Sequence, residues 1–311
     1  MYSYLDISKQ SVHQQIQRDR EAVDLGSKFI EKARQIRKDH PALGCRKLAL
    51  KLLTPQMGRD KIEGLLLQSG FRIVYPPNYT KTTHSVRCSP YLNLIQGLKV
   101  NGINQVVQTD ITYLWVKDKF YYVVLIIDVY SRRIVGYQAS NNMKADANTE
   151  ALRMMIKQRG KKNVTEMIHH SDKGSQYHAA LYLKLLKDHH IKVSMCKEAW
   201  ENAYTERLNR TVKDEYLKLR QLSGLDDLKR ELARTVKLYN QDRPHWSLPK
   251  QASPVDFEKA IAKMSPAERP VLTLYNSETV GRVILTTQGV RNKEAAPRSV
   301  KGAVAASFKL D

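Results

Sequence analysis

The sequence predicts an α/β domain with a mixed sheet, preceded by a smaller all-α region. Three observations indicate this: apolar residues recur at helical spacing within residues 1–72, a two-residue alternation begins near residue 104, and short strands then alternate with helices. At about 100–200 residues per domain, 311 residues suffice for two or three domains.

Positive charge is spread along the whole chain. Lys and Arg number 52 against 31 Asp and Glu, for a net charge of +21. The excess is +6 over 1–72, +3 over 73–104, +7 over 105–222 and +5 over 223–311. A surplus in every part is typical of a protein that binds an extended polyanion such as nucleic acid. A soluble protein that is merely basic is the alternative.

Cysteine use and hydropathy point to an intracellular protein. Cys45, Cys88 and Cys196 are widely spaced and form no C-x-x-C pair, so neither a disulfide framework nor a cysteine zinc site is indicated. The N-terminus lacks a basic-then-apolar signal pattern. The longest apolar run, Phe120 to Ile127, is far too short to span a bilayer, so we expect no membrane partner.

Residues 1–72 are predicted to be helical, with Ser8 as an N-cap and Gly70 at a C-terminal cap. The predicted helices after the first polar stretch are Leu25–Lys38, Cys45–Leu53 and Arg59–Ser69. Helices with basic outer faces fit a helix-turn-helix whose last helix enters the major groove and presents Arg59, Lys61 and Gln68. A generic three-helix packing module fits the spacing equally well.

Residues 73–103 are predicted to be a basic, extended linker, because they contain prolines and no acidic residue. Lys81, Arg87 and Lys99 could follow a phosphate backbone, or could simply keep a linker soluble.

Residues 104–222 are predicted to form the α/β domain. Thr109 and Ile111 share one face of the first strand, and Gln108 and Asp110 share the other. The predicted strands cover 107–115, 120–127, 134–138, 164–168 and 191–194, and the predicted helices cover 144–158, 176–189 and 200–219. Three hairpin strands followed by α-β-α-β-α is the element order of the ribonuclease-H-like fold, a mixed sheet with helices on both faces.

Three carboxylates are the candidate active-site residues. Asp110 lies on the polar face of the first strand, Asp172 directly follows the fourth strand, and Glu206 lies on the last helix. Glu206 shares one helical stripe with Asn202, Asn209, Arg210 and Lys213. Carboxylates supply the oxygen ligands that magnesium and manganese prefer, and two such ions promote phosphodiester chemistry. The alternative for each residue alone is a solvated or salt-bridged surface position.

Other acidic and histidine residues compete for these roles. Asp128 ends the central strand, and we expect it to cap a tight turn with Ser131. Glu198 and Glu201 are alternatives to Glu206. His169, His170, His189 and His190 have no paired cysteines beside them, so we expect site-lining or structural roles and no zinc site.

The C-terminal part divides into two segments. Residues 223–261 are predicted to extend the core through an amphipathic helix, Leu225–Tyr239. Residues 262–311 form a basic segment with strand-like residues at Thr279–Thr287 and an alanine-rich end that is predicted to be partly disordered.

Several motifs carry a family resemblance: QTDITYLWV, DVYSRRIVGY, HHSDKGSQY, SMCKEAWENAYTERLNRTVKDEY and YNQDRPHWSL. Over about residues 30–260 the chain resembles the DDE transposases of bacterial insertion sequences. More narrowly, it is similar to the integrase-core protein of the second reading frame in the two-frame family related to retroviral integrases. Gly44 to Leu48 stands in place of that family's Gly-Tyr-Arg-Arg motif.

The resemblance implies an enzyme that cleaves DNA at the inverted-repeat ends of its element and transfers the freed strands. Asp110, Asp172 and Glu206 would be the catalytic triad and the ligands of two Mg²⁺ or Mn²⁺ ions. The motif neighbours that would shape the site are His170, Gly174, Gln176, Tyr177 and Asn202. The expected DNA contacts are Arg46, Lys47, Arg59, Lys61, Lys81, Arg87, Lys173, Gln176, Asn202, Arg210, Lys213, Arg243 and His245.

The expected partners follow from the same resemblance. They are double-stranded DNA of the terminal repeats and the target, a second copy of the chain or a larger assembly on DNA, and, as an open alternative, a first-frame helix-turn-helix protein. The expected location is the bacterial cytoplasm, at the nucleoid. A catalytically inactive repressor that binds DNA ends is the alternative function, and a plain ribonuclease H is a third.

Overall fold

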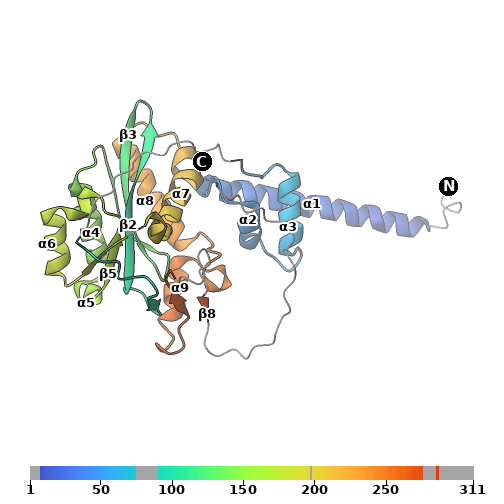
Figure 1. The fold of residues 1–311 in the computed structure, drawn as a ribbon. Coiled ribbons are helices and arrows are strands. Elements are labelled where there is room, and N and C mark those ends of the chain that lie inside the picture. The colour runs from blue at the N-terminus through green and yellow to red at the C-terminus, as the bar shows by residue number, and fades with distance from the viewer. Residues whose placement is uncertain (1–7, 75–89, 197, 276–284, 287–311) are drawn as a thin grey trace, which may run out of the picture.

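A five-stranded mixed sheet lies at the centre of the chain, with strand order β4-β3-β2-β5-β6 (Figure 1). Its strands are β2 (Val106–Val116), β3 (Lys119–Asp128), β4 (Ile134–Ser140), β5 (Ile168–Ser171) and β6 (Lys192–Met195). β2, β3 and β4 form an antiparallel meander, whereas β5 pairs in parallel with both β2 and β6. The predicted ribonuclease-H-like order is therefore confirmed.

The structure is a computed structural model that describes residues 8–74, 90–196, 198–275 and 285–286. Within these ranges, no helix combines the length and apolar character needed to cross a membrane.

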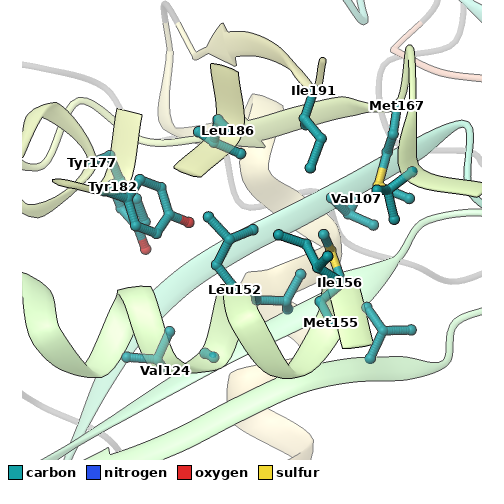
Figure 2. Close-up of a cluster of buried hydrophobic side chains, with 14 of the residues drawn as sticks. Val107, Val124, Leu152, Met155, Ile156, Met167, Tyr177, Tyr182, Leu186 and Ile191 are labelled. Carbon is teal, nitrogen blue, oxygen red and sulfur yellow. The ribbon is translucent and has the colours of Figure 1, made fainter. Parts of the chain in front are cut away.

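Helices cover both faces of the sheet. On one face, α4 (Ala145–Arg159) packs over β3 and β4, and α6 (Ala180–Asp188) packs over β6. The two helices share an apolar cluster that includes Val107, Leu152 and Leu186 (Figure 2). The α4 backbone approaches β4 closely at Gly136, where a Cβ atom would meet the Ala151 carbonyl oxygen at 2.3 Å. On the other face, α7 (Ala203–Glu215) and α8 (Leu225–Gln241) enclose a second apolar cluster.

The N-terminal helices are α1 (Lys9–Asp39), α2 (Cys45–Lys51) and α3 (Arg59–Gln68), which share a small core of their own. Ser8 caps α1 by accepting a hydrogen bond from the Ser11 N–H, as predicted. The predicted helix start at Leu25 is wrong, because α1 runs unbroken through Gly26. The first half of α1 extends away from the rest of the molecule (Figure 1).

Two further element boundaries differ from the prediction. The fourth strand was placed at Val164–Ile168, but Val164 ends the short helix α5 (Lys161–Val164) and β5 begins at Ile168. A short apolar run does not by itself distinguish strand from helix. The predicted helix 200–219 is divided into η3 (Ala199–Asn202), α7 and η4 (Leu217–Leu219), since Tyr216 departs from helical geometry.

A small second sheet joins the segments on either side of the core. β1 (Lys99–Val100) pairs with β7 (Val271–Thr273), which pairs with β8 (Leu285–Thr286). Ile95 and Val100 are buried there against α9 (Pro254–Ile261). Residues 90–103 therefore pack on the core and are not part of a linker, while residues 75–89 lie outside the described ranges. Of the strand predicted at Thr279–Thr287, only Leu285 and Thr286 are described.

Candidate active site

The parallel pairing of β2 with β5 places two of the candidate carboxylates at the same height along the strand direction. Gln108 lies opposite His170 in this parallel pair. Asp110 is two residues beyond Gln108, and Asp172 is two residues beyond His170. Because parallel neighbours advance together at about 3.3 Å per residue, the two aspartates lie side by side, Asp110 within β2 and Asp172 just past the end of β5.

Helix α7 crosses β2 on the face from which Asp110 projects. The Asn209 Nδ2 donates to Asp110 Oδ2 at 2.8 Å, and the Asn202 Nδ2 donates to the Thr109 carbonyl at 3.2 Å. The Lys213 Nζ lies 4.9 Å from the Tyr113 ring centre on β2. The stripe predicted from helical spacing therefore does face β2. Glu206 lies between Asn202 and Asn209 on this stripe and is exposed.

The electrostatics of the site indicate that the three carboxylates are near neighbours. Loss of hydration raises the pKa of Asp110 to about 8, and the negative charges of Asp172 and Glu206 add to that rise. Loss of hydration also raises the pKa of Asp172, although part of this residue is accessible to solvent. A cation placed here would favour the ionised carboxylates. Among the described residues, however, no three Asp, Glu, His or Cys side chains converge closely enough to form a metal site as they stand.

The turn after β5 fixes Asp172. The Gly174 N–H donates to Asp172 Oδ1 at 3.0 Å. A Cβ atom on Gly174 would lie 2.9 Å from Gln176 Oε1 and 3.0 Å from that same aspartate oxygen, so this turn favours glycine. Tyr177 is buried beneath the turn, and burial together with the charges of Asp172 and Asp110 raises its pKa well above the usual value.

The histidines next to this turn have structural partners. His169 bonds through Nε2 to the Tyr182 hydroxyl, and His170 bonds through Nδ1 to the Ser194 hydroxyl, each at 2.8 Å. Burial lowers the pKa of His169 to about 3 and that of His170 to about 4, so both rings are neutral. The expectation of structural roles for these two residues is met.

The competing acids are also accounted for. Asp128 is fully buried and caps the turn after β3, accepting from the Tyr130 and Ser131 N–H groups at 3.1 and 3.0 Å. Glu198 and Glu201 form a reciprocal capping box at the start of η3. These carboxylates are committed to backbone hydrogen bonds, which favours Glu206 as the third member of the site.

The predicted DNA contacts fall into three groups. Arg46, Lys61 and Arg210 are exposed, and Lys47, Arg59, Lys173, Gln176 and Lys213 are partly exposed. Lys81 and Arg87 lie outside the described residues. Asn202, Arg243 and His245 are buried, so their prediction as surface contacts requires correction.

The physical reason is that each of these three side chains serves the fold. Asn202 bonds the β2 backbone. Arg243 forms a two-pronged ion pair with Glu215, at 2.7 and 2.9 Å. His245 packs edge-on against Tyr239, with ring centres 4.7 Å apart.

Asn209 was noted from the sequence only as part of the stripe and not as a functional residue. It directly holds Asp110, and its spacing of seven residues from Asn202 was the signal that could have identified it.

A ribonuclease-H-like core with carboxylates at β2, after β5 and on α7 is the architecture of an integrase-type domain. Comparison with known families agrees, since two families described as "Integrase core domain" match residues 101–199 and 188–253. An uncharacterized 31 kDa protein of insertion element IS600 from Shigella sonnei is 29% identical over 215 residues, covering 67% of this chain and 78% of that protein. Transposase InsF for insertion sequence IS3A from Escherichia coli is 32% identical over 160 residues, covering 49% of this chain and 53% of that protein.

Two solved structures match part of the chain. The magnesium complex of the HTLV-2 integrase catalytic core has 16% identity and a TM-score of 0.40, covering 53% of this chain and 99% of that chain. The simian T-cell lymphotropic virus intasome with the PP2A regulatory subunit B56 gamma has 12% identity and a TM-score of 0.46, covering 73% of this chain and 72% of that chain. Residues 101–253 therefore carry an integrase core domain, and the chain is similar to insertion-sequence transposases. It spans about half the length of the InsF transposases that it matches.

Proposed function

We propose that this protein binds the inverted-repeat ends of an insertion sequence and catalyses metal-dependent cleavage and transfer of DNA strands. The observation that carries the proposal is the placement of Asp110, within β2, beside Asp172, just past the end of the adjacent strand β5, with Asp110 bonded to the helix that bears Glu206. The naming of InsF proteins as transposases supports the same function.

Asp110, Asp172 and Glu206 would hold two divalent ions. When bound, such ions activate the attacking oxygen and stabilise the leaving oxygen of a phosphodiester. The residues fit this role because Asp110 is a poorly hydrated carboxylate beside two further carboxylates, a combination that favours a cation. Asn209 holds one Asp110 oxygen, and the Ile111 N–H holds the other at 2.9 Å, which fixes the carboxylate plane. Glu206 and Asp172 are exposed and therefore accessible to an entering metal ion and DNA.

The exposed basic residues Arg46, Lys61 and Arg210 would contact the DNA backbone, and α3 is the candidate recognition helix. Joining two DNA ends requires two active sites, so we propose at least a dimer on DNA. A first-frame helix-turn-helix protein remains a proposed partner.

The inactive, end-binding repressor is the second candidate. It is supported by the finding that, in the described residues, the three carboxylates do not converge on one metal position without movement. Metal-dependent cleavage separates the two functions.

The test uses labelled DNA that carries the element's terminal repeat, with Mg²⁺ or Mn²⁺. The enzyme proposal expects cleavage by the wild type, none by Glu206→Gln or Asp110→Asn, and wild-type rates for the matched control Glu198→Gln. Cleavage that survives Glu206→Gln but not Glu198→Gln would reassign the third carboxylate. Tight binding to the repeat without cleavage under any metal condition would favour the repressor.

A further inference from the structure

A group of basic side chains gathers around Tyr239 and His245. It comprises Lys47 on α2, Arg132 in the turn after β3, Arg207 on α7, and Arg243 and His245 after α8. The Arg243 guanidinium lies 5.6 Å from the Tyr239 ring centre, and the His245 ring lies 4.7 Å from it. Arg132, Arg243 and His245 are all buried.

Few acidic groups balance this charge. Glu215 is occupied by its two-pronged pair with Arg243. Arg132 donates to the Val129 carbonyl and lies over the Tyr204 ring at 4.2 Å. In the part of the chain that the structure describes, neither Lys47 nor Arg207 has a carboxylate within ion-pair distance.

Two further observations indicate that an anion is expected here. The Nε2 of His245 is buried and, among the described atoms, has no hydrogen-bond partner. Loss of hydration and the charges of Arg243 and Arg207 lower the pKa of Lys47 to about 8, against the opposing effect of Glu215. A poorly hydrated cation beside other cations is unfavourable unless an anion joins them.

The cluster lies where the N-terminal helices meet α7. The Ala42 N–H donates to the Glu215 carbonyl at 3.3 Å, and the Arg46 guanidinium lies 5.5 Å from the Trp246 ring centre. Arg207 and Glu215 are eight residues apart and share one face of α7. That face adjoins the stripe with Glu206, so the cluster borders the candidate active site.

We propose that this junction binds a phosphodiester group of the DNA backbone, with Lys47 and Arg207 as its contacts and Arg243 and His245 behind them. The inference rests on the proposed function in that DNA is taken as the substrate. A bound phosphate would offset the unbalanced charge. It would also connect α2 to α7 one residue from Glu206, which places the DNA backbone beside the active site.

The first test measures binding of the full chain to a short fluorescent DNA duplex in EDTA, across a series of KCl concentrations. Losing one phosphate contact reduces the slope of log K against log salt by about 0.9. We expect that reduction, with weaker binding, for Lys47→Ala and Arg207→Ala. Lys162→Ala, which removes an exposed lysine on α5, should match the wild type. Circular dichroism melts check that each variant is folded.

The second test uses pH, with Lys47→Arg as the comparison. A bound phosphate raises the pKa of Lys47 above its free value of about 8, so wild-type affinity is complete below that pH and falls above it. Arginine stays charged over the whole pH range. The DNA affinity of Lys47→Arg should therefore not show the decrease at high pH that deprotonation of Lys47 causes in the wild type. The charged groups that face Lys47 are Arg207, Arg243, His245 and Glu215, and none of them differs between the two proteins.

The outcomes separate this inference from the proposed function, because binding is measured without cleavage. Equal salt slopes for Lys47→Ala and Lys162→Ala, or equal pH profiles for wild type and Lys47→Arg, would overturn the phosphate site even where cleavage is normal. If inorganic phosphate, but not the duplex, shows the Lys47-dependent effect, the site takes free phosphate and the DNA assignment is wrong. A wild-type chain that neither binds nor cleaves DNA would overturn both ideas.

Discussion

A buried ion network attaches the C-terminal helix α9 to the core, and replacing its arginine is a demanding test of the fold. Arg159, at the end of α4, donates to Glu258 at 2.6 and 3.1 Å and to Asp128 at 3.3 Å. Ser131 and Arg133 complete the set by donating to Glu258 at 2.8 and 2.5 Å. All of these side chains except Arg133 are buried.

Arg159→Met keeps most of the side-chain volume but leaves two buried carboxylates without their shared cation. Breaking a buried pair from one side costs about 3–5 kcal/mol. Glu258 retains Ser131 and Arg133, and Asp128 retains backbone N–H donors, including that of Asn104 at 2.8 Å. We therefore expect the lower end, about 3 kcal/mol, which is a large share of a total stability of about 5–15 kcal/mol.

The stability that Arg159→Met loses relative to the wild type should grow as the pH increases. Burial already raises the pKa of Asp128, with the Arg159 charge opposing that rise, and the Arg159 hydrogen bond and charge help to keep the pKa of Glu258 low. Without Arg159 both values rise, so the variant loses stability relative to wild type as pH increases from about 4, where unfolded carboxyls titrate. Urea unfolding of both proteins at acid and alkaline pH measures this difference. A cost below about 1 kcal/mol at alkaline pH, the range of an exposed pair, or a cost that does not shrink in acid would refute the reasoning.

Three further perturbations test other parts of the structure. Gly136→Ala should destabilise by about 1–3 kcal/mol in urea unfolding because α4 must move away, whereas Gly64→Ala on open α3 should be neutral or stabilising; equal effects would contradict the close approach. Asn209→Ala should slow metal-dependent cleavage about 10–100-fold while circular dichroism stays native, because the Asp110 carboxylate loses its donor; an unchanged rate would exclude that positioning role. Burial lowers the pKa of His40, so protonation below about pH 6.5 should loosen the N-terminal helices, seen as lower hydrogen-exchange protection factors in α2. A His40→Gln variant should lack this acid response, and the same acid response in that variant would exclude His40 as its source.

Much of the core could be predicted because its signals are local. The alternation around Asp110 fixed which residues share its face, and the turn chemistry after β3 identified Asp128 as a cap. The helical spacing of Asn202 and Lys213 identified the face of α7 that meets β2. In each case the residues that determine the feature lie within a few positions of each other or in one element, so the local sequence pattern is enough to predict it.

The features that the sequence did not predict depend on contacts between residues far apart in the chain. Nothing near Arg243 reveals that Glu215 on another helix will neutralise it and bury it, so a basic residue in a basic protein suggested a DNA contact. The composition of residues 90–103 predicts a linker, whereas the pairing partner of this segment, β7, lies some 170 residues later. Local composition cannot indicate such long-range pairing. Tertiary contacts therefore override the structure that local composition predicts.

The way the N-terminal helices attach to the core would affect how the proposed DNA contact at α2 reaches the candidate active site. Their apolar core is separate from those of the sheet, and polar bonds join the two parts: His40 to Tyr216 and Asp242, Lys51 to Asp242, and Asp39 to Arg234. Exposed ion pairs weaken as salt screens them, so salt acts on this attachment as well as on DNA. A phosphate bound by Lys47 and Arg207 would hold the two parts together from both sides, and its loss should therefore weaken DNA binding and the attachment together.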